Sequence, residues 1–170
     1  MRKVLLVEDE NLIRRGLRYQ VDWTEVNCVV AGEAATGAEG LEKIQSLQPD
    51  IVITDIRMPD MNGLEMLRLG RSQCKFSALI LSGYSQFEYA REAIHLGVEE
   101  YLLKPVDIGE LKNCLLRIGQ RSSSGSALSP VLPTAELKTA RNKYVAIMLQ
   151  YIREHYAEPI SLTDLSQELD

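Results

Sequence analysis

The sequence predicts an α/β fold, a doubly wound parallel sheet of five strands covered by five helices. From residue 3 to residue 119, short apolar runs alternate with segments of helical periodicity, which is the pattern of consecutive βαβ units. Because crossovers between parallel strands are right-handed, such a series winds helices onto both faces of the sheet. A ligand site is then expected at the carboxyl ends of the strands, beside the point where strand order reverses.

The predicted strands are five apolar runs separated by turn residues. Pro49-Asp50 precedes the third run, and Asn62-Gly63 follows the loop after it. The runs comprise residues 4–7, 28–31, 51–54, 78–81 and 101–103.

The predicted helices follow these runs, at residues 12–21, 40–47, 64–69, 87–96 and 108–118. Three of them have an apolar stripe at helical spacing. Gly97 is a typical C-terminal cap for the fourth. The stripes consist of Ile13, Leu17 and Val21; of Leu41, Ile44 and Leu47; and of Ala90, Ala93, Ile94 and Leu96.

A change of composition after Ile118 divides the chain. Residues 1–119 form the predicted α/β domain, and the small polar residues of 120–134 predict a flexible linker. Residues 135–170 have helical periodicity that Pro159 interrupts, and Ser161 or Thr163 could cap a further helix. Two helices are too few for an independent core, so the order of this segment should depend on packing elsewhere.

Composition and charge exclude several classes of protein. The formal net charge is −5, without the basic excess of a nucleic-acid surface. The apolar run near the amino terminus is too short for a signal peptide or a membrane span, which predicts a cytoplasmic protein with no membrane association. Cys28, Cys74 and Cys114 lack metal-ligand spacing and are predicted to be buried thiols in a reducing compartment.

Polar residues follow four of the five predicted strands. Clustered carboxylates bind a hard divalent cation, an aspartate can be a nucleophile, a hydroxyl can bond a phosphoryl oxygen, and a lysine can pair with it. Taken singly, an acidic residue at a helix start can serve the helix dipole, a serine can be a turn residue and a lysine a surface charge. The residues are Glu8, Asp9 and Glu10; Asp55; Ser82; and Lys104 with Pro105. The helix dipole is explanation enough for Glu10, but chance is a poor explanation for the other five together at four strand ends, Glu8, Asp9, Asp55, Ser82 and Lys104.

Over residues 2–119 the chain resembles the CheY-like receiver domains of two-component response regulators. The matching motifs are Val-Glu8-Asp9, Val-Ile-Thr-Asp55-Ile-Arg-Met-Pro-Asp-Met-Asn-Gly, Leu-Ser82-Gly and Leu-Leu-Lys104-Pro105. The resemblance implies a flavodoxin-like sheet with strand order 2-1-3-4-5. It also implies a phosphoacceptor that assists its own phosphorylation and dephosphorylation, rather than an enzyme, with a sensor histidine kinase as its partner.

The resemblance assigns a role to each residue of the acidic group. Asp55 is the expected phosphoacceptor. Asp9, Asp55 and the backbone carbonyl of Arg57 are the expected ligands of Mg²⁺, with Glu8 contributing through a water molecule. Glu8 occupies a position where many family members have aspartate.

The remaining family positions concern the response to phosphorylation. Ser82 and Tyr101 are the expected switch pair, in which the hydroxyl moves towards the phosphoryl group and the ring turns inward. Lys104 should meet the phosphoryl oxygens from a cis Lys104–Pro105 peptide bond. Arg57 and Tyr84 occupy the positions that flank the attacking water, and their bulk predicts slow autodephosphorylation.

The segment from Tyr151 to Leu169 resembles the opening of an AraC-type DNA-binding domain, and the whole chain resembles the YesN type of regulator. The implied protein is a transcription factor that binds DNA only through its full-length output domain. The family also implies a possible homodimer through residues 86–118. A generic amphipathic helix followed by a capped turn is the alternative for the tail.

Three other functions fit the sequence less well than that of a receiver domain. A haloacid-dehalogenase phosphatase needs an aspartate two residues after the nucleophile, where this chain has Arg57. A nucleotide or flavin domain needs a glycine-rich first turn, where this chain has Glu8-Asp9-Glu10. A phospho-dependent interaction module without a DNA role remains the closest alternative.

Overall fold

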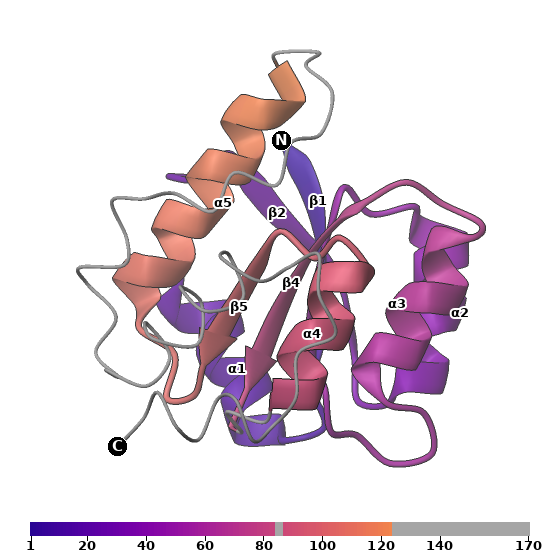
Figure 1. Ribbon diagram of the computed structural model, residues 1–170. Coiled ribbons are helices and arrows are strands. Elements are labelled where there is room, and N and C mark those ends of the chain that lie inside the picture. The colour runs from indigo at the N-terminus through magenta and orange to yellow at the C-terminus, as the bar shows by residue number, and fades with distance from the viewer. Residues whose placement is uncertain (84–86, 124–170) are drawn as a thin grey trace, which may run out of the picture. The chain divides into compact units, whose positions relative to one another are not determined.

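A computed structural model of the chain describes residues 1–83 and 87–123, all within one compact unit, Met1–Ser126 (Figure 1). Its five strands form one parallel sheet in the order β2-β1-β3-β4-β5, which confirms the predicted flavodoxin-like fold. The strands are β1 Arg2–Val7, β2 Cys28–Ala34, β3 Ile51–Asp55, β4 Ser77–Ser82 and β5 Glu100–Leu103. The helices are α1 Asn11–Gln20, α2 Gly37–Leu47, α3 Gly63–Arg71, α4 Phe87–His95 and α5 Ile108–Ser123.

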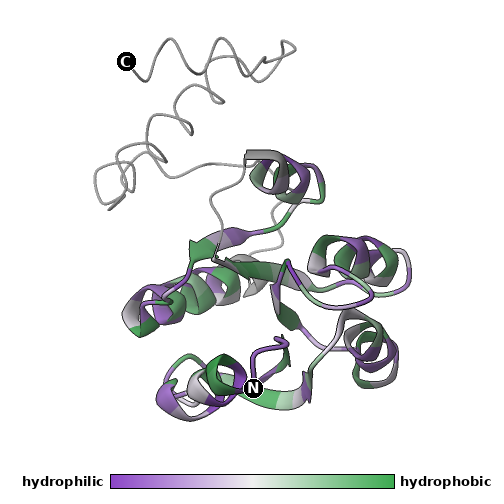
Figure 2. Cartoon of the chain, turned by 90° about the horizontal axis from the view of Figure 1, so that it is seen from below, coloured by the Kyte–Doolittle hydropathy of each residue, from purple (hydrophilic) through white to green (hydrophobic). Residues whose placement is uncertain are grey.

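Two apolar clusters, one on each face of the sheet, hold the layers together. Leu17 of α1 and Leu115 of α5 pack against one face, where Val4 and Leu6 of β1 meet them. The other cluster joins the opposite face to α2, α3 and α4. Figure 2 shows the largely apolar sheet between helices that carry both apolar and polar residues. Burial on both sides explains why the runs in the inner strands β1, β3 and β4 are continuously apolar.

The predicted boundaries agree with the structure to within a few residues, apart from two differences. Helix α5 continues to Ser123, four residues into the predicted linker 120–134, because Gln120 and Arg121 are good helix formers. Ile94 is 49% exposed, so its place on the apolar stripe of α4 was wrong. Ala93 faces the core instead, and Ile94 lies about 100° further around the helix.

The predicted turn residues have the expected conformations. Gly97 has φ +67° and follows α4, with its N–H donating to the carbonyl of Ile94. Asn62 caps α3, and its Oδ1 accepts from the N–H of Glu65 at 2.8 Å. The start of α3 and the end of α4 are therefore each fixed by local chemistry.

Strand β2 contains one more residue than its neighbour β1. Val4 pairs with Val30, but Leu5 pairs with Gly32, so Ala31 has no partner in the register. This extra residue is a β-bulge in the edge strand of the sheet. Beyond it the pairing continues regularly as far as Val7 and Ala34.

The three cysteines, all within the described residues, form no disulfide. Cys28 and Cys114 are buried as predicted, and burial raises the pKa of Cys28. Cys74 differs, since it is only half-buried at the edge of its cluster. Cys28 and Cys114 should therefore react more slowly than Cys74 with thiol reagents.

The other predicted segments lie outside the described residues. These are the rest of the linker from residue 124, the helical segment 135–170, and its suggested caps Ser161 and Thr163. Among the residues that the structure does describe, no helix has the length and apolarity needed to cross a membrane.

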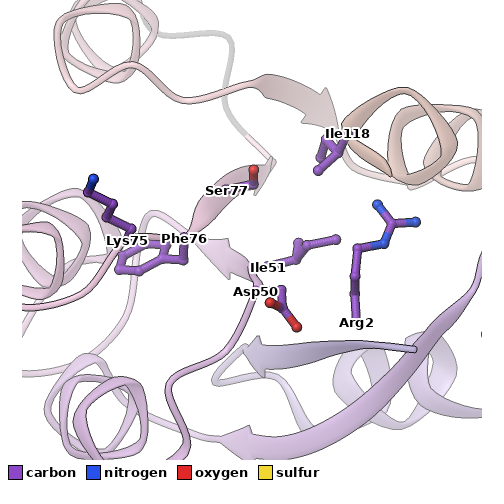
Figure 3. A pocket seen from close by; sticks show the side chains of 7 residues that line it. All are labelled: Arg2, Asp50, Ile51, Lys75, Phe76, Ser77 and Ile118. Carbon is purple, nitrogen blue, oxygen red and sulfur yellow. The ribbon is translucent and has the colours of Figure 1, made fainter. Parts of the chain in front are cut away.

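A pocket of about 350 Å³ opens at the amino-terminal ends of β3 and β4 (Figure 3). Asp50, Ser77 and Ile118 line it, together with Arg2, which donates to the carbonyls of Val26 at 2.8 Å and Leu115 at 3.2 Å. The remaining lining residues are Ile51, Lys75 and Phe76. The pocket is at the opposite edge of the sheet from the polar residues that follow the strands, so it is separate from their chemistry.

A partly buried carboxylate joins the start of β4 to α3 and to the turn before β5. Glu99 accepts from the N–H of Ala78 at 2.5 Å and lies 3.5 Å from Arg71. Arg71 also donates to the carbonyls of Leu96 and Gly97 and lies over the ring of Phe76. Burial raises the pKa of Glu99 above its ordinary value of 4.5, although these contacts oppose the shift.

Glu99 should therefore make the stability of the domain depend on pH. Because its pKa is raised in the folded state, its contribution is fully present below pH 4.5 and is lost as the pH rises through the folded pKa. We expect the stability of Glu99→Gln relative to the parent to be greater at pH 7 than at pH 4, as measured by urea unfolding at each pH. Glu42→Gln, at an exposed position on α2, is the control. An equal difference from the parent at both pH values would contradict the prediction.

Candidate active site at the carboxyl edge of the sheet

The loop after β1 provides three acidic residues. Glu8 is 1% exposed, and its N–H donates to the carbonyl of Ala34 at 3.0 Å, which continues the pairing of β1 with β2. Asp9 and Glu10 are exposed. Glu10 precedes the first turn of α1 and makes no side-chain capping hydrogen bond. The loop thus carries one buried and two accessible carboxylates.

Asp55 ends the central strand β3 and is 7% exposed. Its Oδ1 accepts from the N–H of Ile56 at 2.5 Å and from the N–H of Arg57 at 3.3 Å. The start of α3 lies close behind, because a Cβ on Gly63 would be 1.9 Å from the carbonyl oxygen of Asp55. Glycine is therefore required where the helix approaches the strand end.

Lys104 connects the two buried carboxylates. Its Nζ lies 2.5 Å from Oδ2 of Asp55 and within 2.9 Å of both carboxylate oxygens of Glu8. The N–H of Lys104 donates to the carbonyl of Ser82 at 2.8 Å, and the following bond to Pro105 is cis. The ammonium group is 3.7 Å from the more exposed Glu10.

The charges at this site alter one another. Burial raises the pKa of Glu8, while hydrogen bonding to Lys104 opposes the rise. For Lys104, burial alone would lower the pKa, but hydrogen bonds and charges from Asp55 and Glu8 outweigh it and raise the pKa. Lys104 is therefore charged at neutral pH.

The acidic residues have the composition of a site for a hard divalent cation. Carboxylate oxygens of Glu8, Asp9 and Asp55 lie within 4.8 Å of one another. Oε2 of Glu8 is buried and, although 2.8 Å from Lys104, makes no hydrogen bond with suitable angles. It can accept from a further donor such as bound water. An all-oxygen set with one accessible member fits Mg²⁺, which keeps part of its water shell.

Ser82 ends β4, and Tyr101 is the second residue of the neighbouring strand β5. Ser82 is 1% exposed and Tyr101 is half-buried. Burial raises the pKa of Tyr101, a hydrogen bond with the Ser82 side chain lowers it, and the charge of Asp55 raises it again. The phenol thus keeps its proton at neutral pH and forms a hydrogen bond with the side chain of Ser82.

This geometry agrees with a match of residues 4–116 to the response regulator receiver domain. The chain belongs to this family. Receiver domains of two-component systems are phosphoacceptors, interact with a histidine kinase and bind Mg²⁺ at an acidic pocket.

Curated relatives of this receiver protein are longer chains. HptR of Staphylococcus aureus (strain bovine RF122 / ET3-1), a transcriptional regulatory protein, is 36% identical over 179 residues, covering all of this chain and 70% of HptR. An uncharacterized response regulatory protein of Staphylococcus epidermidis is 34% identical over 182 residues, again covering 70% of that protein.

A solved receiver structure has the same fold. The receiver domain of AraT from Geobacillus stearothermophilus is 36% identical, with a TM-score of 0.68 over 72% of this chain and 95% of that domain.

The receiver structure brings together most of the predicted site residues. Glu8, Asp9, Asp55 and Lys104 converge directly, and Ser82 with Tyr101 lies next to them. Arg57 is exposed after β3, and its N–H contacts Asp55. Tyr84 lies outside the described residues.

One residue of this receiver was missed by sequence reasoning. Arg14 in the first turn of α1 donates to the backbone carbonyl of Glu8 at 2.5 Å. A basic side chain near a helix amino terminus opposes the helix dipole. That unfavourable placement, directly after the acidic triplet, was the signal available in the sequence.

Proposed function

We propose that this chain is the regulatory part of a response regulator in which a histidine kinase transfers a phosphoryl group to Asp55. The observation that carries the proposal is the position of the Lys104 ammonium, 2.5 Å from Asp55 and next to Glu8. A buried lysine that bridges two carboxylates provides positive charge where phosphoryl oxygens would arrive.

In the transfer, a carboxylate oxygen of Asp55 bonds to phosphorus while the bond from phosphorus to the donor breaks. The N–H groups of Ile56 and Arg57 orient the carboxylate through Oδ1. Lys104 then pairs with the oxygens of the transferred group. The Asp55 carboxylate is thus oriented, and the Lys104 ammonium is in position, before the donor arrives. Such positioning of groups and charges is the main requirement of phosphoryl transfer.

Asp9, Asp55, the backbone carbonyl of Arg57 and, through water, Glu8 are the proposed ligands of Mg²⁺. Bound Mg²⁺ neutralises charge on the phosphoryl oxygens. The carboxylate cluster and the buried oxygen of Glu8 support this assignment. Glutamate at position 8 is compatible with this assignment, because Oε1 accepts from Lys104 at 2.9 Å while the buried Oε2 can accept from bound water.

Phosphorylation would be read out through Ser82 and Tyr101. Their hydrogen bond next to Asp55 supports this role, because a new phosphoryl group would compete for the serine hydroxyl. Arg57 and Tyr84 are proposed to slow the loss of the phosphoryl group by crowding the path of water.

The proposed output is transcription control by an AraC-type domain of YesN type that begins within 135–170, after the linker. The similarity to HptR, a transcriptional regulatory protein, extends over the whole chain and so includes this segment, which supports the proposal. DNA would be bound only by the full-length output domain. A homodimer through residues 86–118 is supported by the exposed apolar side chains of Ile94 and Leu116, 49% and 42% exposed.

The proposal is tested by intact-mass measurement after incubation with acetyl phosphate. With Mg²⁺ we expect the addition of one phosphoryl group, and with excess chelator we expect none, because the carboxylates would then repel the donor. Adding Mg²⁺ back should restore the addition, which serves as the control for damage by the chelator. Equal addition with and without the metal would contradict the proposed site.

A further inference from the structure

Arg14 connects the acidic loop to the neighbouring strand. Its Nη1 donates to the carbonyl of Glu8 at 2.5 Å, and its Nη2 donates to Oδ1 of Asn11 at 3.3 Å. On its other side, Nε lies 3.7 Å from Oε2 of Glu33 on β2. The Arg14 side chain is 16% exposed, so it is largely shielded from water, although its contact with Asn11 lies at the surface.

Glu33 is itself held in place. Its Oε1 accepts from Arg18 of α1 at 2.7 Å, and its backbone carbonyl accepts from Lys43 of α2. The next residue of β2, Ala34, accepts the N–H of Glu8. The carboxylate that contacts Arg14 therefore belongs to a strand end already tied to two helices and to the loop.

The carbonyl that Arg14 contacts belongs to the peptide unit between Glu8 and Asp9. Because a peptide unit is planar, fixing its carbonyl fixes the direction in which Asp9 leaves the strand. Asp9 is the exposed member of the carboxylate cluster. Without the guanidinium group, no other side-chain donor among the described contacts holds this carbonyl.

We propose that Arg14, supported by Glu33, is a positioning residue for the metal-binding loop and sets the affinity of the carboxylate cluster for Mg²⁺. The inference rests on the proposed function, because it takes that cluster to be the metal site. A guanidinium group suits the role, since its fork can contact the carbonyl and Glu33 at once, whereas a lysine ammonium makes point contacts.

The test compares Mg²⁺ dissociation constants of the whole 170-residue chain by calorimetry. We expect Arg14→Met to weaken binding by about tenfold or more, as residues that orient metal ligands typically do. Arg14→Lys should recover part of the loss. Phosphoryl addition from acetyl phosphate should fall at low Mg²⁺ and recover at saturating Mg²⁺, since Asp55 and Lys104 are unchanged.

Two controls separate positioning from stability. Arg15→Met removes an exposed charge from the same turn of α1, and Arg18→Met removes the other partner of Glu33. Urea unfolding without Mg²⁺ gives the stability of each variant. We expect Arg18→Met to lose stability with an almost unchanged dissociation constant, and Arg15→Met to change neither by much.

The outcomes are distinct. If Arg14→Met is too unstable to measure, Glu33→Gln, which weakens the support of Arg14, should still raise the dissociation constant several-fold. An unchanged constant in Arg14→Met, or in Glu33→Gln where Arg14→Met cannot be measured, would overturn the role of Arg14 while leaving the proposed function intact. Equal weakening by Arg15→Met would overturn it as well. If the parent chain itself neither binds Mg²⁺ nor takes up a phosphoryl group, the proposed function fails and the inference with it.

Discussion

Asp55→Asn is expected to abolish phosphoryl uptake from acetyl phosphate in the presence of Mg²⁺. The amide lacks the anionic oxygen that would attack phosphorus and removes one carboxylate from the proposed metal site. Its oxygen can still accept from the N–H of Ile56, so the fold should survive. Intact mass shows the loss of uptake, and circular dichroism checks the fold.

Asp60→Asn provides a matched control for this change. Asp60 is an exposed aspartate in the loop that follows, with φ +66°, a conformation that asparagine also tolerates. Normal uptake by this variant is expected. Uptake of one phosphoryl group by Asp55→Asn would place the acceptor at a different residue.

Lys104→Met is expected to cost stability as well as phosphoryl transfer. Glu8, Asp55 and Lys104 are at most 11% exposed in their side chains, and the variant leaves two buried carboxylates without a cation. Removing one partner of a buried ion pair typically costs about 3–5 kcal/mol. Urea unfolding at neutral pH without Mg²⁺ measures the difference.

The pH dependence identifies the ammonium group as the cause. The pKa of Lys104 is raised in the folded state, so its contribution is fully present below its ordinary value of 10.5 and is lost as the pH rises through the folded pKa. The difference in the free energy of unfolding between the parent and Lys104→Met should therefore become smaller as the pH rises above 10.5. Mg²⁺ should stabilise the variant more than the parent, because the cation would relieve the carboxylate repulsion.

Lys112→Met is the matched control, because Lys112 also forms an ion pair, with the 62% exposed carboxylate of Glu25. Such surface pairs contribute about 0–1 kcal/mol. If both lysine variants lost equally little stability, the bridge between Glu8 and Asp55 would not hold the site together.

Local patterns in the sequence were sufficient to predict the order of elements and most of the site. Each strand contains a continuous apolar run, and the carboxyl-edge rule then places Asp9, Asp55 and Lys104 together without any knowledge of contacts. The position of Gly97 also followed from local chemistry, because a left-handed residue ends a helix.

The features that could not be predicted depend on contacts between distant residues. The exposure of Ile94 depends on how α4 is rotated against the sheet, and either of two neighbouring apolar residues could have faced inward. The contacts of Arg14 with Glu8 and Glu33 join a loop, a helix and an edge strand. Nothing in the spacing of these residues along the chain reveals that they meet.

The β-bulge at Ala31 determines which helix layer Glu33 faces. Paired residues of parallel strands point to the same side, and Glu33 pairs with Leu6, whose side chain packs in the cluster beneath α1. If the same residues of β2 continued from Val30 without a bulge, Glu33 would pair with Val7 and point towards α2. The bulge at Ala31 thus turns this carboxylate towards Arg14, so the geometry of the acidic loop depends on a local irregularity in the neighbouring strand.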